Sequence, residues 1–232
     1  TYDLGAAEER FKKYKFDKMI YVTDFRQNEH FSQLFKLLEL FGYKFSKDCS
    51  HLGFGTVRFG NEIIATRKGQ IILLEDVLKK TISKAEEEIK KRKTKGNPEK
   101  VGVGAVKYIV LKSAPAADVQ FSWEQALNFE GDSGPYIQYS YARASSILKK
   151  VKSSKSKVKI QNLTTQEVSL VKKINSFPEI VKNAEKSLNP SLIANYSFEL
   201  AQQFNEFYHA CPVINSENES FRISLVKSFR IA

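Results

Sequence analysis

Cysteine is scarce in this chain of 232 residues: there are two, Cys49 and Cys211, far apart in the sequence. Two distant cysteines exclude a disulfide-stapled framework, and no C-x-x-C pair indicates a structural zinc site. Apolar runs long enough to span a membrane are also lacking, and the first residues show no signal-peptide pattern. We therefore expect no metal site, no membrane association and a reducing compartment, the cytoplasm.

Acidic residues are outnumbered by basic ones, 26 to 37, which gives a formal net charge of +11. A basic excess favours polyanionic partners, with nucleic acid first and an acidic membrane surface second. The alternative is a lysine-rich chain with no such partner. A hydrophobic content of 42% and a charged content of 27% are those of a folded protein, and the length suits one large domain or two ordinary ones.

The first 130 residues alternate between strand-like and helix-like patterns. The apolar, β-branched run at 19–23 predicts a buried strand, and a β-like pattern returns at 51–60. Apolar residues at three- and four-residue steps predict helices over 30–43, 73–93 and 101–113. This alternation predicts an α/β layer.

From about residue 101 the pattern becomes helical, and after 130–135 it is helical throughout. Pro135 suits the first turn of a helix over 135–150, and Thr164 with Glu167 forms a capping box that opens another helix. Further helices are predicted over 164–187, 191–214 and from 220 onward. We therefore place a boundary at 130–135, with an α/β domain over 1–130 and an all-helical domain over 131–232.

Two segments of the first domain could bind a polar ligand. In ATRKGQ, at 65–70, Arg67 and Lys68 stand beside a glycine before a helix, a combination that can hold nucleotide phosphates. The alternative is a basic surface turn. Gln27 and His30 follow the first predicted strand, and open α/β sheets bind ligands at the carboxyl ends of their strands. The alternative for His30 is a capping or packing role.

Three tyrosines and an arginine begin the helix of the second domain, within GDSGPYIQYSYARASSILKK at 131–150. On a helix, Tyr136, Tyr139 and Arg143 share one face, and aromatic rings beside a guanidinium form a stacking platform for unpaired bases. The alternative is that the tyrosines pack between helices and Arg143 pairs with an acidic residue. RNA is favoured because attraction to phosphates adds up over the lysines 149, 150, 152, 155, 157 and 159.

Taken in order, these segments resemble the carboxyl-terminal half of an arginyl-tRNA synthetase, a class I aminoacyl-tRNA synthetase. YDLGAA at 2–7 resembles the family's T-R-D-[LIV]-[GA]-A segment, and ATRKG at 65–69 resembles the loop that replaces K-M-S-K-S. FEGDSGPYIQYSYARASSIL at 129–148 resembles the junction with the anticodon-binding domain. The segments that resemble that domain's last helices are FNEFYHACPV at 204–213 and RISLVKSFR at 222–230.

The resemblance covers nearly the whole chain and implies the end of a Rossmann-type catalytic domain, with parallel strands and helices, followed by an all-helical anticodon-binding domain. It implies an arginine–tRNA ligase, which activates L-arginine with ATP to arginyl-adenylate and passes the arginyl group to the 3′ end of arginine tRNA. ATP would act as a substrate with Mg²⁺, and we expect no tightly bound cofactor and a monomeric protein.

The resemblance also assigns residues to roles. Those that match the family's arginine pocket are Asp3, Gln27 and His30. Those that match the ATP signature loop are Thr66, Arg67, Lys68 and Gly69, of which Arg67 and Lys68 would stabilise charge on the leaving pyrophosphate. Those that match contacts with the anticodon loop of tRNA are Tyr136, Tyr139 and Arg143.

The sequence departs from the family in two respects. Ile63, Ile64 and Ala65 stand where the signature begins with lysine, methionine and serine, which leaves the chemistry to Arg67 and Lys68. The H-x-G-H motif is not in this sequence and the last family helix is expected to run on past its end, so this segment alone is expected to be inactive. The alternative functions are a non-catalytic tRNA- or RNA-binding module and a lysine-rich helical scaffold for proteins or acidic membranes.

Overall fold

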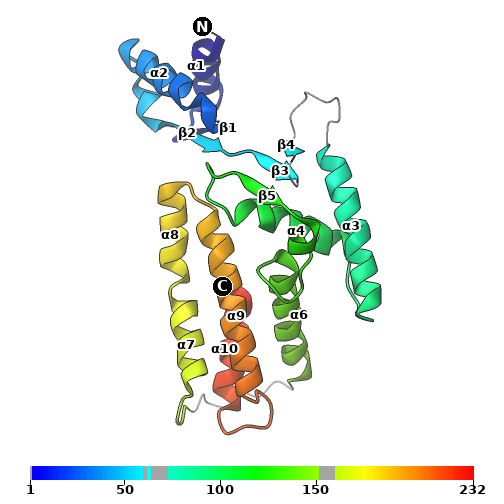
Figure 1. Ribbon diagram of the computed structural model, residues 1–232. Helices are drawn as coiled ribbons and strands as arrows, with labels where there is room; N and C mark the ends of the chain where they lie inside the picture. The colour runs from blue at the N-terminus through cyan, green and yellow to red at the C-terminus, as the bar shows by residue number, and fades with distance from the viewer. Residues whose placement is uncertain (1, 60–61, 64–72, 152–159) are drawn as a thin grey trace.

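The computed structural model describes residues 2–59, 62–63, 73–151 and 160–232. Figure 1 shows a small α/β unit at the top, a second layer with strands β3 to β5 and helices α3 and α4 in the middle, and a helical bundle below. In the part of the chain that is described, no helix combines the length and the apolarity needed to cross a membrane.

The N-terminal unit pairs two parallel strands and covers one of their faces. Its elements are α1 (Tyr2–Tyr14), β1 (Met19–Asp24), η1 (Phe25–Gln27), α2 (Asn28–Leu40), η2 (Lys44–Asp48) and β2 (Cys49–Phe54). In the parallel ladder Met19 lies opposite Cys49. Its buried core consists of Ala7, Phe31, Leu34, Leu38 and Phe45. The strand predicted at 19–23 is confirmed, but full burial is wrong, because Ile20 and Val22 are 40% and 59% exposed on the other face.

The middle layer is a separate small sheet. Its elements are β3 (Val57–Phe59), β4 (Glu62–Ile63), α3 (Leu74–Lys91), α4 (Pro98–Leu111), β5 (Val119–Phe121) and α5 (Trp123–Ala126). β3 pairs antiparallel with β4 and parallel with β5. The β-like stretch at 51–60 therefore belongs to two sheets. It divides at Gly55, where a Cβ would lie 2.3 Å from the carbonyl oxygen of Ala117, so the close approach requires glycine.

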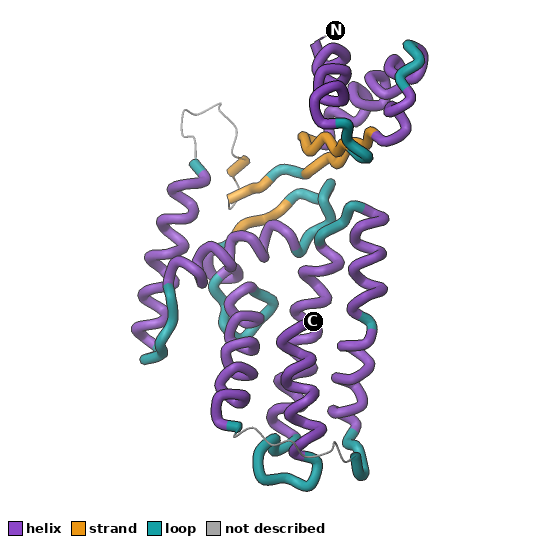
Figure 2. The backbone as a smooth tube through the Cα atoms, turned by 180° about the vertical axis from the view of Figure 1, so that it is seen from behind, coloured by secondary structure: helices purple, strands orange, loops and turns teal. Residues whose placement is uncertain are grey.

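Among the described residues five helices form the bundle, which Figure 2 shows from behind. They are α6 (Gly134–Lys150), α7 (Thr165–Asn175), α8 (Phe177–Ser187), α9 (Ser191–Ala210) and α10 (Glu219–Ile231). The capping box of Thr164 and Glu167 is confirmed. The helical stretch predicted over 164–187 is confirmed as two helices, because Pro178 lies in the first turn of α8 and α7 ends before it. The largest fully buried apolar side chains of the bundle are Leu170, Tyr196, Phe204, Phe207 and Val226.

The bundle is attached to the middle layer through α4. A Cβ on Gly134 would lie 2.6 Å from the carbonyl oxygen of Gly104, so the two glycines let α6 and α4 approach closely. Asp132 accepts hydrogen bonds from the hydroxyl of Tyr108 and, at 3.0 Å, from the ammonium of Lys112. These bonds tie the start of α6 to α4. The division into domains at 130–135 stays a prediction.

Candidate functional site

The arginine of the α6 platform is held between two tyrosines. The guanidinium carbon of Arg143 lies 4.7 Å from the ring centre of Tyr139 and 4.8 Å from that of Tyr208, which comes from the last turn of α9. A cation over each ring face is attracted by the ring quadrupole. The two tyrosines remain 47% and 39% exposed, so part of their surface is available to a ligand.

Hydrogen bonds fix the orientation of this guanidinium. Arg143 donates to the side-chain oxygen of Asn205 and, at 3.1 Å, to the hydroxyl of Tyr139. The amide nitrogen of Asn205 donates in turn to Ser140 Oγ at 2.8 Å. The bonds from Arg143 to Asn205 and to Tyr139 use two of the five N–H groups of the guanidinium. Arg143 thus pairs with an amide and a phenol rather than with the acidic residue that the alternative interpretation requires.

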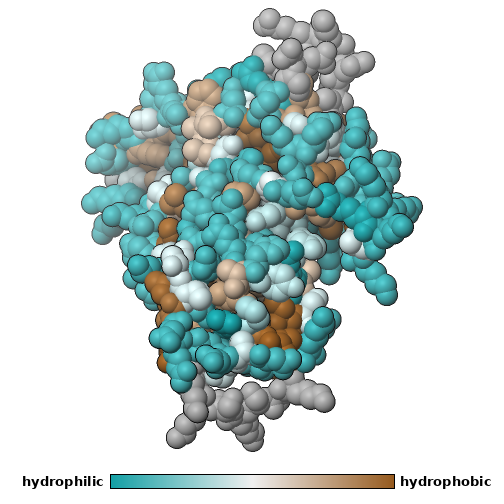
Figure 3. Space-filling model, turned by 60° about the horizontal axis from the view of Figure 1, so that its bottom comes forward, coloured by the Kyte–Doolittle hydropathy of each residue, from teal (hydrophilic) through white to brown (hydrophobic). Residues whose placement is uncertain are grey.

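A groove of about 510 Å³ opens beside this stack. Its lining side chains are Tyr139, Arg143, Ser146, Ile147 and Lys150 of α6, Tyr208 of α9, and Pro212, Val213 and Ile214 of the segment that follows α9. Ile147 and Val213 are buried, whereas Lys150 is exposed. In Figure 3, which brings the bottom of the molecule forward, brown apolar surface lies among teal polar surface. Aromatic rings, an apolar floor and cations are the features that unpaired nucleotides bind.

The structure separates the three tyrosines of α6. Tyr136 is partly buried, and its ring centre lies 5.4 Å from that of Phe198 on α9. Tyr141 faces α10, where Arg230 donates to its hydroxyl at 3.1 Å and lowers the pKa of that phenol. Neither residue lines the groove. Contact between Tyr136 and tRNA stays a prediction, and its packing on Phe198 agrees with the alternative interpretation.

Tyr208 and Asn205 were missed by the sequence analysis, which assigned the whole of 191–214 to one periodic helix. The available signal was the pair Phe207 and Tyr208. Neighbouring residues on a helix point about 100° apart, so two adjacent aromatic residues cannot both enter the core. Phe207 is fully buried and Tyr208 faces the groove.

The polar residues predicted near the first strand come together in part. His30 Nε2 lies 3.0 Å from a carboxylate oxygen of Asp3, which joins α2 to the first turn of α1. Both side chains remain accessible, at 55% and 42% exposure. Gln27 is exposed at the start of α2, one helical turn before His30. The three side chains therefore occupy the same end of β1.

His51 is a further polar residue at this end that the sequence analysis missed. Its ring nitrogens lie 2.8 Å from Thr23 Oγ1 and 2.8 Å from the side-chain oxygen of Asn28, and its ring stacks on Phe31 with centres 4.5 Å apart. Burial lowers the pKa of His51, which favours the neutral ring. The histidine links β2 to β1 and α2 and supports the surface that carries Gln27.

The predicted signature-loop residues lie outside the described residues. These are Thr66, Arg67, Lys68 and Gly69. Four of the lysines predicted to attract RNA phosphates, 152, 155, 157 and 159, also lie outside the described residues. Among the described residues, no group of three or more acidic, histidine or cysteine side chains gathers in a way that could hold a metal ion.

Two family models match the chain. The model described as tRNA synthetases class I (R), catalytic domain, matches residues 1–123, and the model described as DALR anticodon binding domain matches residues 137–232. The arginine–tRNA ligase of Clostridium acetobutylicum is 43% identical over 100% of this chain, and that of Clostridium botulinum strain Alaska E43 is 41% identical over 98%. The chain spans 43% and 42% of the length of these relatives.

Solved structures show the same fold. The arginyl-tRNA synthetase of Thermus thermophilus superposes with a TM-score of 0.84 at 28% identity, covering 93% of this chain and 38% of that one. The arginyl-tRNA synthetase of Plasmodium falciparum gives a TM-score of 0.82 at 27% identity, covering 99% and 41%. These matches confirm the predicted fold class, an α/β part followed by a helical anticodon-binding domain. The chain belongs to the arginyl-tRNA synthetases of class I.

Proposed function

We propose that the full-length protein is an arginine–tRNA ligase and that the groove of this chain binds the anticodon loop of arginine tRNA. The observation that carries the proposal is the stack of Tyr139, Arg143 and Tyr208 at the edge of the groove. It lies within the residues that match an anticodon-binding model. Relatives named arginine–tRNA ligase support the activity.

The stack suits unpaired bases because it is ordered before they arrive. The cation between the rings fixes both tyrosines, so less side-chain freedom is lost when a base stacks on their exposed surface. Arg143 uses two of its N–H groups to bond Asn205 and Tyr139. The remaining N–H groups can donate to a phosphate or to a base edge. Lys150 and the lysines that follow it would add attraction to phosphates that weakens as salt rises.

At the other end of the chain, Asp3, Gln27 and His30 would bind L-arginine. A carboxylate can accept two parallel hydrogen bonds from a guanidinium. The Asp3 carboxylate is held in place by its contact with His30. Arg67 and Lys68 would stabilise the charge that builds up on pyrophosphate as ATP reacts. Mg²⁺ would enter with ATP, because phosphate oxygens are its preferred ligands. We further propose a monomer that works in the cytoplasm.

The test is Tyr139→Ala in the full-length protein. Base stacking on an aromatic side chain is worth 1–3 kcal/mol, so the affinity for arginine tRNA should fall by about tenfold. Arginine-dependent exchange between ATP and pyrophosphate, measured at saturating tRNA, should be unchanged. The matched control is Tyr141→Ala, because Tyr141 is 48% exposed on the same helix but does not line the groove. An equal loss of binding and exchange would make Tyr139 a structural residue.

A further inference from the structure

One wall of the groove has no regular secondary structure. Pro212, Val213 and Ile214 belong to the segment 211–218, which joins α9 to α10. Val213 is buried, and Cys211 next to this wall is fully buried. Because helix hydrogen bonds do not fix such a segment, its position depends on the packing of Cys211 and Val213 in the core of the bundle and on hydrogen bonds from elsewhere in the bundle.

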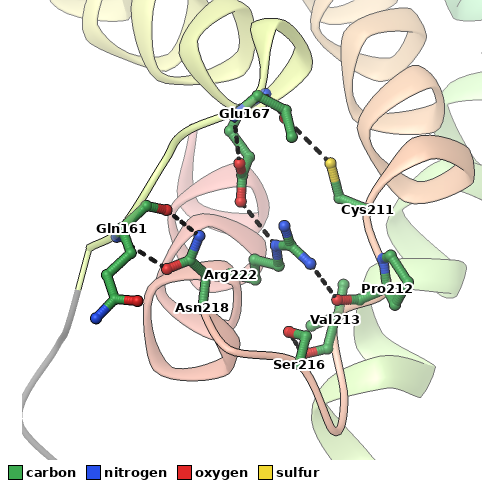
Figure 4. A network of polar contacts seen from close by, with 9 residues as sticks. Gln161, Glu167, Cys211, Pro212, Val213, Ser216, Asn218 and Arg222 are labelled. Carbon is green, nitrogen blue, oxygen red and sulfur yellow. Dashed lines mark hydrogen bonds and ion pairs between the residues drawn. The ribbon is translucent and has the colours of Figure 1, made fainter.

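A single guanidinium ties this wall to another helix, as Figure 4 shows. Arg222 of α10 donates from Nε to a carboxylate oxygen of Glu167 at 2.7 Å and from a terminal nitrogen to the carbonyl oxygen of Pro212 at 2.7 Å. The Glu167 side chain is fully buried and that of Arg222 is 11% exposed. The pair therefore links α7, α10 and the groove wall with almost no contact with water.

Glu167 is itself fixed by the start of α7. Its second carboxylate oxygen accepts the backbone N–H of Thr164 at 2.8 Å, and its own N–H donates to the Thr164 hydroxyl at 3.2 Å. That hydroxyl also lies 3.2 Å from Cys211 Sγ. Burial opposes the charge of Glu167, but the bonds from Arg222 and Thr164 outweigh it and lower the pKa of the carboxyl.

The far end of the segment is held by a second contact. The side chain of Asn218 accepts the backbone N–H of Gln161 at 3.0 Å and donates to the carbonyl oxygen of the same residue at 2.6 Å. Segment 211–218 is thus anchored near both ends to the chain that enters α7. Arg222 supplies the anchor beside the groove.

A buried ion pair is costly to desolvate, and apolar side chains of similar volume often give equal or higher stability. Stability alone therefore does not explain Glu167 and Arg222. We propose that this pair is a positioning device: it holds the wall of Pro212 to Ile214 against the stack of Tyr139, Arg143 and Tyr208 and so sets the affinity of the groove for unpaired anticodon-loop nucleotides. The inference rests on the proposed function of the groove.

The test is the double variant Glu167→Gln/Arg222→Met in the full-length protein. Glutamine keeps the capping box, methionine keeps a long side chain without a donor, and no charge is left buried alone. The bonds that Arg222 donates to Glu167 and to Pro212 are lost together. We expect a folded protein whose affinity for the anticodon stem–loop of arginine tRNA falls by about tenfold, as for one lost charge-assisted hydrogen bond. KM for tRNA should rise with kcat unchanged.

The matched control is Lys173→Met/Glu199→Gln. This pair joins α7 to α9 in the same bundle, and neither residue lines the groove. The same chemical change there should leave RNA affinity unchanged. Where the first double variant fails to fold, Arg222→Lys takes its place, because an ammonium keeps the charge next to Glu167 but lacks the fork that reaches two acceptors. It too should weaken RNA binding.

The outcomes separate this inference from the proposed function. Wild-type RNA affinity in a folded Glu167→Gln/Arg222→Met or Arg222→Lys protein, together with weak binding by Tyr139→Ala, would overturn the positioning role alone. Wild-type affinity in Tyr139→Ala would overturn the groove as the RNA site. A fall in melting temperature without a change in RNA affinity would reduce the pair to a structural contact.

Discussion

The two candidate binding regions of this chain are built in different ways. In the groove, Arg143 is held between two rings and bonded to Asn205, which is 8% exposed, so its geometry is set before any ligand arrives. In the N-terminal unit, Asp3 and His30 make one contact with each other and both stay accessible. The groove is therefore preorganised, whereas the N-terminal cluster can exchange its internal contact for one with a ligand.

This contrast has an energetic meaning. A preorganised site loses little conformational entropy on binding, but each side chain in it depends on its neighbours. A solvent-exposed contact between two polar side chains contributes little to folding and can be altered with little effect on stability. Substitutions in the groove should therefore change binding and stability together, and substitutions in the N-terminal cluster should change binding alone.

Arg143→Ala should have the largest effect. It removes the cation from two rings and leaves the side-chain oxygen of Asn205 without its donor, so RNA affinity should fall by about 100-fold and the melting temperature should drop. Binding of arginine tRNA and thermal unfolding of the full-length protein measure both effects. The control is Arg230→Ala, which removes the cation from Tyr141 outside the groove and should leave RNA affinity unchanged. Unchanged binding in Arg143→Ala would contradict preorganisation.

Asp3→Asn should have the next largest effect, and on arginine rather than RNA. It removes a charged acceptor for a guanidinium, so KM for L-arginine should rise by about 30-fold. The melting temperature and the affinity for tRNA should stay as in the wild type, because the Asp3 side chain is 42% exposed and α1 lies at the top of Figure 1, away from the bundle that carries the groove. Steady-state aminoacylation kinetics with varied arginine are the measurement. A rise in KM for tRNA of the same size would show that the two regions are not independent.

The smallest effect concerns pH and the stability of the N-terminal unit. The pKa of His51 is lowered in the folded state, so its contribution to stability is complete above the unfolded value of 6.5 and is lost as pH falls through the lower folded value. Amide hydrogen exchange, corrected for intrinsic rates, should show less protection of β1 and β2 at pH 5.5 than at pH 7.5. The bundle helices serve as the internal reference. Equal changes in both units would assign the effect to other groups.

Much of the helical bundle follows from sequence alone because its signals are local. The capping box at Thr164 and the position of Pro135 in the first turn of α6 depend on residues three or four positions apart, and both are confirmed. The helical stretch over 164–187 is divided into two helices for a local reason that the sequence also contained, Pro178. The β-like stretch at 51–60 is confirmed as strand, but its division between two sheets has a distant cause, because Gly55 meets Ala117 more than sixty residues away.

The sequence by itself determined the helices, the order of the two parts, the resemblance to arginyl-tRNA synthetases and the placement of Tyr139 and Arg143 on one helix face. Only the tertiary structure decided that Tyr208 completes the stack, that Tyr141 faces α10, and that Glu167 meets Arg222. Periodicity and capping record contacts within one turn of a helix. Arg143 and Asn205 are 62 residues apart and Glu167 and Arg222 are 55 apart, and only packing between helices brings them together.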